Sequence, residues 1–215
     1  MKPIIEIENL NKTFAGTTVL HNMNMQINEG EMVAIVGESG CGKTTLLNIL
    51  GLISLPTSGH YMIKGKTIKY INTKDAMMLR RHTIGYLFQN YGLVEDETVE
   101  WNLKLDYAYK KTSKKIQKEE MERLLDEFQL TGKLKNKVYQ LSGGEQQRLA
   151  LIKLIIKDCD IILADEPTGS LDASNRDPVM HKLLQMNQQH KTIVIVTHDM
   201  NVANSCHRII ELSHT

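Results

Sequence analysis

Cysteine is scarce in this chain of 215 residues, and its pattern excludes a disulfide framework. Cys41, Cys159 and Cys206 are odd in number, and they follow no spacing typical of metal ligands. The eight histidines are also scattered without such a spacing. Because disulfides persist in oxidising compartments and are rare in the cytosol, we expect a reduced, cytosolic protein.

Excess charge and long apolar runs are also missing. The 26 lysine and arginine residues nearly balance the 25 aspartate and glutamate residues, so the net charge of +1 does not indicate a nucleic-acid partner. The basic run at 110–118 is therefore expected to be a solvated loop and helix face. Residues 1–10 lack the apolar core of a signal peptide, and no run approaches the ~18 apolar residues of a membrane span. We expect any role at a membrane not to involve crossing it.

Three short β-branched runs indicate the core of the fold. They occupy residues 32–37, 161–166 and 192–199, and none of them alternates between apolar and polar residues. Such runs are typical of strands buried on both faces, as in a parallel sheet covered by helices. In open α/β sheets ligands bind beyond the carboxyl ends of the strands, so the polar residues that end these runs are candidate site residues.

The rest of the chain divides into a β-layer and a helical block. Residues 4–14, 17–27 and 58–68 alternate more and are separated by turn residues, which predicts a small antiparallel β-layer. We predict one α/β domain over residues 1–215. Its sheet core and β-layer lie at about 1–88 and 160–215, and a helical subdomain lies at about 89–159.

One helix of that block can be outlined in the sequence. The segment from Lys114 has the period of an amphipathic helix, and Gly132 is the expected left-handed residue after its last turn. The apolar face is predicted to consist of Ile116, Met121, Leu124, Leu125 and Phe128.

A glycine-rich segment between the first buried strand and an apolar helix indicates a phosphate-binding loop. Its sequence, GESGCGKTT, has the pattern G-x-x-x-x-G-K-[ST], whose backbone N–H groups cradle phosphate oxygens beside a helix N-terminus. The lysine of the pattern is expected to reach the β- and γ-phosphates, and the first threonine to bind Mg²⁺. The loop residues are Gly37, Glu38, Ser39, Gly40, Cys41, Gly42, Lys43, Thr44 and Thr45.

The other two buried strands end on residues that complement this loop. Asp165 is placed to hold Mg²⁺ through water, and Glu166 beside it to act as the general base for an attacking water. His198 follows the third strand, where we expect it to contact the γ-phosphate.

The segment LSGGEQQR, Leu141 to Arg148, is an unusual helix start. Ser142 and Glu145 form the S-x-x-E pattern of a capping box, which accounts for the two of them. It does not account for Gly143 and Gly144, since each glycine costs about 1 kcal/mol of helix propensity relative to alanine. Two glycines at a helix N-terminus leave N–H groups bare, which suits an anion.

These motifs, in this order and over essentially the whole chain, resemble the nucleotide-binding subunit of an ATP-binding-cassette (ABC) transporter. The resemblance implies a P-loop NTPase core of the RecA-like kind that binds ATP and Mg²⁺. Gln89, which ends IGYLFQ, is implied to join Thr44 and Asp165 at the metal and to sense the γ-phosphate. Phe14 is implied to stack on the adenine, and Asp172 of the SLD segment to lie at the nucleotide site.

The family resemblance also implies partners. Two copies are expected to pack head-to-tail, so that Ser142, Gly143, Gly144 and Glu145 of one copy close over the ATP held by the other copy. A separate membrane-spanning permease would hold the dimer at the cytoplasmic face of the membrane.

The region around Gln89 is similar to the branch that contains macrolide-efflux, lipoprotein-releasing and antimicrobial-peptide exporters. Export of such cargo is therefore the favoured function. The alternative is an ATPase that drives a membrane partner mechanically, as in cell-division complexes that control wall hydrolases. Ribosome-acting and DNA-repair relatives fit poorly, because they carry two cassettes or a long coiled coil.

Overall fold

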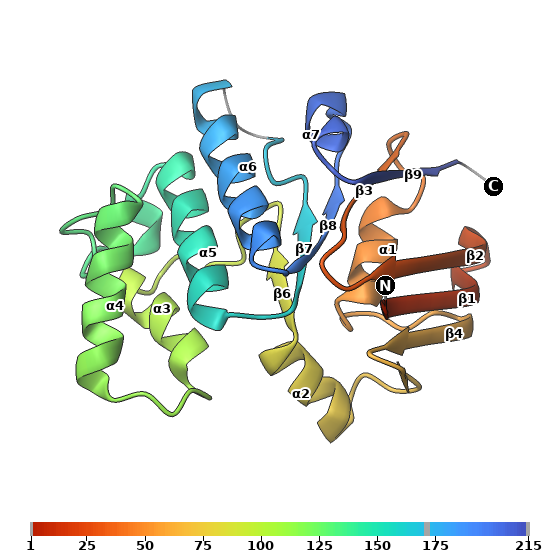
Figure 1. The fold of residues 1–215 in the computed structure, drawn as a ribbon, viewed down its shortest axis with the longest axis horizontal. Coiled ribbons are helices and arrows are strands. Elements are labelled where there is room, and N and C mark those ends of the chain that lie inside the picture. The colour runs from red at the N-terminus through yellow and green to blue at the C-terminus, as the bar shows by residue number, and fades with distance from the viewer. Residues whose placement is uncertain (1, 170–172, 214–215) are drawn as a thin grey trace.

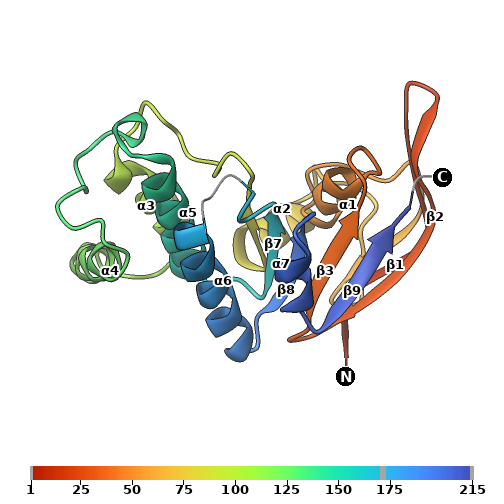
Figure 2. The same cartoon turned by 90° about the horizontal axis from the view of Figure 1, so that it is seen from above.

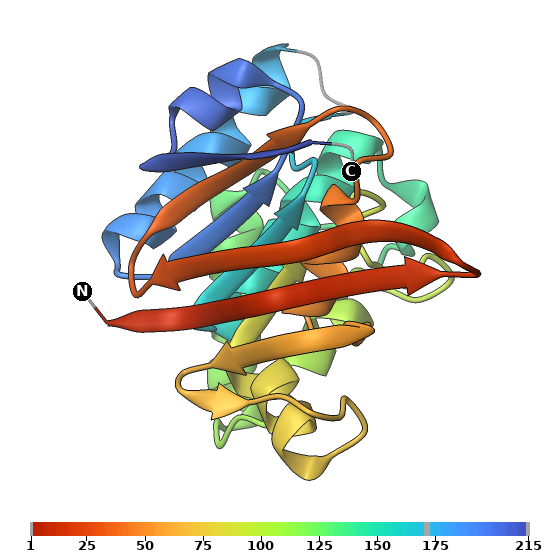
Figure 3. The same cartoon turned by 90° about the vertical axis from the view of Figure 1, so that its right-hand side faces the viewer.

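Two sheets organise the structure, a computed structural model that describes residues 2–169 and 173–213. The first is antiparallel and has the strand order β2-β1-β4-β5. Its strands lie side by side at the right of Figure 1 and cross the front of Figure 3. It confirms the predicted N-terminal β-layer, and its strands are β1 (Pro3–Phe14), β2 (Thr17–Asn28), β4 (Ser58–Ile63) and β5 (Lys66–Thr67).

The second sheet has the order β6-β7-β8-β3-β9, and all of its strand pairs are parallel. The three buried runs form adjacent strands at its centre, and nearly every residue in them is buried, as predicted. The carboxyl ends of these strands therefore meet at one edge of the sheet. The strands are β6 (Ile84–Leu87), β7 (Ile161–Asp165), β8 (Thr192–Val196), β3 (Met32–Gly37) and β9 (Arg208–Leu212).

Helices cover both faces of the parallel sheet (Figure 2). Where the structure describes a cap, most of the longer helices begin after a threonine or serine whose hydroxyl accepts a backbone N–H, as at Thr73, Thr98, Ser113 and Ser142. The helices are α1 (Lys43–Leu50), α2 (Lys74–His82), α3 (Val99–Tyr107), α4 (Lys114–Glu127), the 3₁₀ turn η1 (Val138–Gln140), α5 (Gly143–Lys157), α6 (Ala173–Gln188) and α7 (Met200–Asn204).

Each face of the parallel sheet has its own apolar core. On one face, α3, α4, α5 and α6 pack together around buried residues such as Leu103, Leu149 and Ile195. On the other, α1 and the antiparallel sheet enclose residues such as Leu47 and Ile5. The helical block of residues 89–159 thus shares a core with the sheet. The division of the chain into a sheet core and a helical subdomain at about 89–159 stays a prediction.

α4 begins at Lys114 as predicted, but one residue of its apolar face and its C-terminal end differ from the prediction. Ile116 is 53% exposed and so lies outside the packed face, whereas Met121, Leu124, Leu125 and Phe128 are buried. The helix ends earlier than predicted, and the left-handed residue after it is Gln129, with φ of 57°. The N–H of Leu130 donates to the carbonyl of Leu125 across this turn, which closes the helix without a glycine.

Candidate functional site

The phosphate-loop segment joins the end of β3 to the start of α1 in a tight backbone curl. Gly37, Gly40 and Gly42 have φ values of 154°, 85° and 98°, which L-residues rarely adopt. Gly37 also has no room for a side chain, because a Cβ there would overlap the carbonyl oxygen of Leu212 on β9 and lie 2.7 Å from Sγ of Cys41. The glycine is required by both conformation and space.

Replacing Gly37 by alanine is expected to lower the melting temperature well beyond the effect of strain alone. Gly65→Ala is the matched control, since Gly65 has φ of 71° and no atom within 4 Å of a built Cβ. In the control, the free energy of unfolding should fall by about 1–2 kcal/mol, which lowers the melting temperature by roughly 2–8 °C for a chain of this size. In Gly37→Ala, the overlap should lower the free energy of unfolding by about 1–3 kcal/mol more. Equal melting curves by circular dichroism would contradict the close approach of β9 to this loop.

The side chains of the loop converge on a cleft of about 470 Å³ at the carboxyl edge of the parallel sheet. Inside the loop, Nζ of Lys43 donates to the carbonyl oxygens of Gly37 and Glu38, each at 2.7 Å. The cleft brings together most of the predicted site residues, namely Phe14, Ser39, Gly40, Gly42, Lys43, Thr44, Thr45, Gln89, Asp165 and Glu166.

Three predicted nucleotide-binding residues of the loop do not line the cleft. Gly37 lies against Leu212 behind the loop, Glu38 does not border the cleft, and Cys41 is buried with Sγ 3.8 Å from Nζ of Lys43. Their assignment as nucleotide-binding residues stays a prediction. Asp172 lies outside the described residues.

Thr44 and Asp165 meet at the floor of the cleft. The hydroxyl of Thr44 donates to Oδ1 of Asp165 at 3.3 Å, although 121 residues separate the two in the chain. Burial raises the pKa of the Asp165 carboxyl, a shift that the hydrogen bond from Thr44 opposes and the nearby Glu166 carboxylate reinforces. A hydroxyl, a carboxylate and the amide of Gln89 in the same cleft are all-oxygen donors of the kind Mg²⁺ prefers.

Glu166 is held in an unusual conformation beside Asp165. Its φ of 47° is in the left-handed region, and its N–H donates to the carbonyl of Val196 on β8. Its carboxylate lies 2.8 Å from Nδ1 of His198 and accepts the hydroxyl of Thr197 at 3.3 Å. Backbone strain of this kind is typical of functional sites, where the surroundings fix one side-chain position.

The predicted capping box of α5 is present in full. The hydroxyl of Ser142 accepts the N–H of Glu145 at 3.3 Å, and Oε2 of Glu145 accepts the N–H of Ser142 at 2.8 Å. That backbone hydrogen bond is the main reason why the pKa of Glu145 is lowered, and Lys133 at 3.4 Å adds to the shift. The carboxylate is thereby kept ionised at the helix N-terminus, where negative charge is stabilising.

The start of α5 does not share the cleft of the phosphate loop. Figures 1 and 2 show α5 separated from α1 by the central strands of the sheet. None of the four predicted residues from Ser142 to Glu145 lines the cleft. Gly143 is also not needed for packing within this chain, because a Cβ there would meet only Oη of Tyr91, at an ordinary contact distance of 3.5 Å.

Two further residues hold the segments around the site in place, and neither was predicted from the sequence. Gln147 is 3% exposed, and its amide donates to the carbonyl of Pro167, which links α5 to the residue after Glu166. Asn102 is fully buried and holds the segment after Gln89 by exchanging hydrogen bonds with both backbone groups of Val94, at 2.9 and 3.0 Å. The only available signal was a polar amide on a helix face that is otherwise apolar.

The parallel sheet, the phosphate-loop geometry and the acidic strand end define a P-loop nucleotide-binding α/β protein. Within this class the match is specific: the family described as ABC transporter matches residues 20–169. The chain belongs to the ABC transporter family and is an ABC-type ATPase.

Curated relatives extend beyond the chain. The macrolide export ATP-binding/permease protein MacB of Acinetobacter baylyi is 42% identical over 98% of this chain, and that of Vibrio parahaemolyticus is 40% identical over 97%. The chain spans about a third of these relatives, covering 32% and 33% of their lengths.

Solved structures share the whole fold. The ATP-binding cassette MJ0796, determined as a dimer in a post-hydrolysis state bound to ADP and Pi, has a TM-score of 0.88 and is 35% identical, over 97% of this chain and 94% of that one. The cbiO1 component of the cbiONQ transporter complex from Clostridium perfringens has a TM-score of 0.83 and is 27% identical, over 99% and 85%.

Proposed function

We propose that this chain binds ATP and Mg²⁺, hydrolyses the ATP within a dimer of two head-to-tail copies, and thereby drives a membrane permease that exports an amphipathic cargo. The observation that carries the proposal is the single cleft that holds Lys43, Thr44, Gln89, Asp165 and Glu166 together. In this arrangement the loop N–H groups and Lys43 hold the phosphates, and Phe14 at the rim stacks on the adenine.

The metal would be held by Thr44, by Asp165 through water, and by Gln89. Bound there, Mg²⁺ would supply positive charge to the β- and γ-phosphate oxygens. The hydrogen bond between the side chains of Thr44 and Asp165 supports this assignment, because a single ion would have to contact both of them. Mg²⁺ usually keeps several waters and takes few protein ligands, which fits a site with one buried carboxylate.

Glu166 acts as the general base of hydrolysis. It accepts a proton from water as the water oxygen bonds to the γ-phosphorus, and the bond to the oxygen bridging the β-phosphate breaks to leave ADP and phosphate. The contacts from Thr197 and Nδ1 of His198 orient the carboxylate. They leave Nε2 of His198 as the ring nitrogen for a γ-phosphate oxygen.

The start of α5 serves the second copy of the chain. Its N-terminus suits an anion, yet it is separated from the phosphate loop of its own chain, and its first glycine has no packing role there. In a two-fold, head-to-tail dimer each α5 N-terminus closes over the γ-phosphate bound by the partner subunit. The dimeric relative bound to ADP and Pi supports this assembly.

A groove next to Gln89 is the proposed seat of the permease. It encloses about 240 Å³ and is lined by apolar and aromatic groups that include Ile53, Tyr86, Phe88 and Tyr91. Phe88 is partly exposed and stacks on Tyr86 at 4.0 Å, so an aromatic surface directly precedes the residue proposed to sense the γ-phosphate. A permease segment in this groove would couple closure of the dimer to the membrane domain.

The permease would also provide the attachment to the cytoplasmic face of the membrane. In the ranges that the structure describes, no helix combines the length and the apolar character needed to cross a bilayer. The MacB relatives are named as ATP-binding and permease proteins, and this chain covers about a third of each. We therefore propose that a membrane partner supplies the permease part that these relatives carry in the same chain.

Cargo export is tested by reconstitution with the membrane protein that co-purifies with this chain. In liposomes, ATP turnover is expected to rise on addition of the right amphipathic cargo, with a macrolide, an antimicrobial peptide and a lipoprotein as candidates. The cargo should cross or leave the membrane only with ATP. Turnover without movement of any cargo would contradict the export proposal and leave the ATPase assignment intact.

A further inference from the structure

Positive charge is concentrated in two segments of this nearly neutral chain. Residues 64–82 and 104–118 together hold twelve of the 26 basic residues and two of the 25 acidic ones. Their formal charge is +10, and that of the rest of the chain is −9. A separation of this size produces a surface field that the net charge of +1 conceals.

The two segments form one continuous surface. The guanidinium of Arg81 at the end of α2 lies over the ring of Tyr109 after α3, with 3.9 Å between its carbon and the ring centroid. A shallow groove of about 230 Å³ runs between them, lined from both sides by Met77, Arg81, Leu105 and Tyr109. Figure 1 places α2 and the α3–α4 connection along the lower edge of the molecule. We call this combination of residues 64–82 and 104–118 the basic face.

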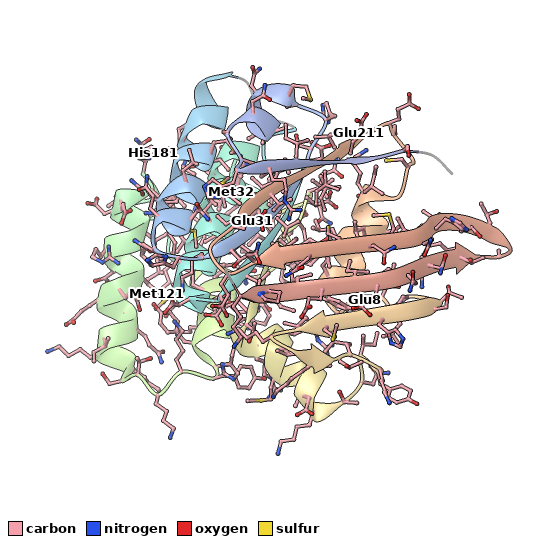
Figure 4. All side chains as sticks on the ribbon, turned by 45° about the vertical axis from the view of Figure 1, so that its right-hand side comes forward. Glu8, Glu31, Met32, Met121, His181 and Glu211 are labelled. Carbon is pink, nitrogen blue, oxygen red and sulfur yellow. The ribbon has the colours of Figure 1, made fainter. Side chains whose placement is uncertain are left out.

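Much of the charge on the basic face is available to a partner. Six of its lysines form no ion pair with any described residue: Lys66, Lys69, Lys74, Lys110, Lys111 and Lys114. Figure 4 shows long side chains with nitrogen tips projecting below α2 and below the lower end of α4. The run at 110–118, expected from sequence to be merely solvated, is therefore one part of a larger charged surface.

Aromatic and aliphatic side chains are interleaved with these lysines. Tyr70 and Tyr109 are 67% and 54% exposed, and Met78 and Leu105 are also exposed. Tyrosine among lysines is typical of surfaces that lie at the headgroup level of a bilayer, where the rings enter the interface and the ammonium groups meet phosphates.

The basic face also points to the same side as the proposed permease groove. The two grooves share Arg80, Asp106 and Lys157 in their linings, so they lie next to each other. A permease bound beside Phe88 would therefore bring the basic face close to the bilayer. This step rests on the proposed function, whereas the charge and the exposed side chains do not.

We propose that the basic face binds the anionic phospholipid headgroups of the membrane in which the permease lies. Juxtamembrane lysines gain about a fivefold increase in partition each at an anionic surface, and the attraction falls off within a Debye length. The lipid contact would orient the cassette below its permease without contributing to ATP chemistry.

The test is co-sedimentation of the full chain with vesicles. Vesicles of phosphatidylcholine containing 30% phosphatidylglycerol should bind the wild type at low salt, and pure phosphatidylcholine vesicles should not. Lys111→Gln/Lys114→Gln is expected to weaken the partition by about 30-fold. The matched control is Lys2→Gln/Lys137→Gln, which removes the same charge from exposed lysines outside the basic face and should bind like the wild type.

Three results would overturn the proposal. They are equal binding to both kinds of vesicle, equal loss in the two double variants, and vesicle binding unchanged by Lys111→Gln/Lys114→Gln while recovery of the permease falls. The last would assign the face to a protein contact. ATP turnover should be unchanged in both double variants. If the wild type shows no turnover, the proposed function is refuted, but the lipid binding is not affected by that result.

Discussion

Replacing Glu166 by glutamine is expected to lower ATP turnover by about 10²–10⁴-fold, the usual scale for the loss of a general base. The amide has almost the same volume and can still accept the hydroxyl of Thr197, so the cleft should keep its shape. Without a base, the ATP sandwiched between two copies is not consumed. The variant should therefore accumulate as an ATP-bound dimer.

Steady-state phosphate release and size-exclusion chromatography with ATP and Mg²⁺ measure the two effects together. Glu211→Gln is the matched control, because Glu211 is an exposed acid on β9 (Figure 4) and the same charge is removed there. The control should turn over like the wild type and should not dimerise more. Wild-type turnover in Glu166→Gln would refute the role of Glu166 as the base.

Replacing Gly144 by aspartate is expected to abolish ATP-dependent dimerisation while ATP still binds to the single chain. The aspartate adds a negative charge to the N-terminus of α5 at the position that should meet the partner's γ-phosphate. The phosphate loop lies in a different part of the same chain, so the affinity of that loop for ATP should not change. Turnover should fall with dimerisation.

Equilibrium binding of a fluorescent ATP analogue and sedimentation velocity separate the two steps. Asn72→Asp serves as the control, since it adds a negative charge at an exposed position just before α2. The control should bind ATP and dimerise like the wild type. Loss of ATP binding by the Gly144→Asp monomer would instead place this residue at the nucleotide of its own chain.

Local patterns predicted those parts of the molecule that depend on neighbouring residues. The buried strands at 32–37 and 161–165 follow from unbroken β-branched runs, because strands buried on both faces leave no polar positions. The capping box of Ser142 and Glu145 follows from a spacing of three residues within one helical turn. The glycines of the phosphate loop follow from the curl that a backbone cradle requires.

Features that depend on distant contacts were not predictable in the same way. Ile116 has the right helical spacing but nothing packs over it, and Gln129 closes α4 because local hydrogen bonds compensate for its left-handed conformation. The contact of Gln147 with Pro167 joins residues twenty positions apart across two elements. The basic face likewise arises only when α2 and the α3–α4 connection come together.

If each ATP is shared by two copies of the chain, mixing two inactive variants should restore activity. Lys43→Ala disables the phosphate loop, and Gly144→Asp disables the α5 N-terminus. A mixed dimer would contain one site built from the intact loop of one copy and the intact helix start of the other. An equal mixture is expected to recover turnover that neither variant shows alone, because each mixed dimer has one intact site. A mixture as inactive as either variant alone would contradict the shared site.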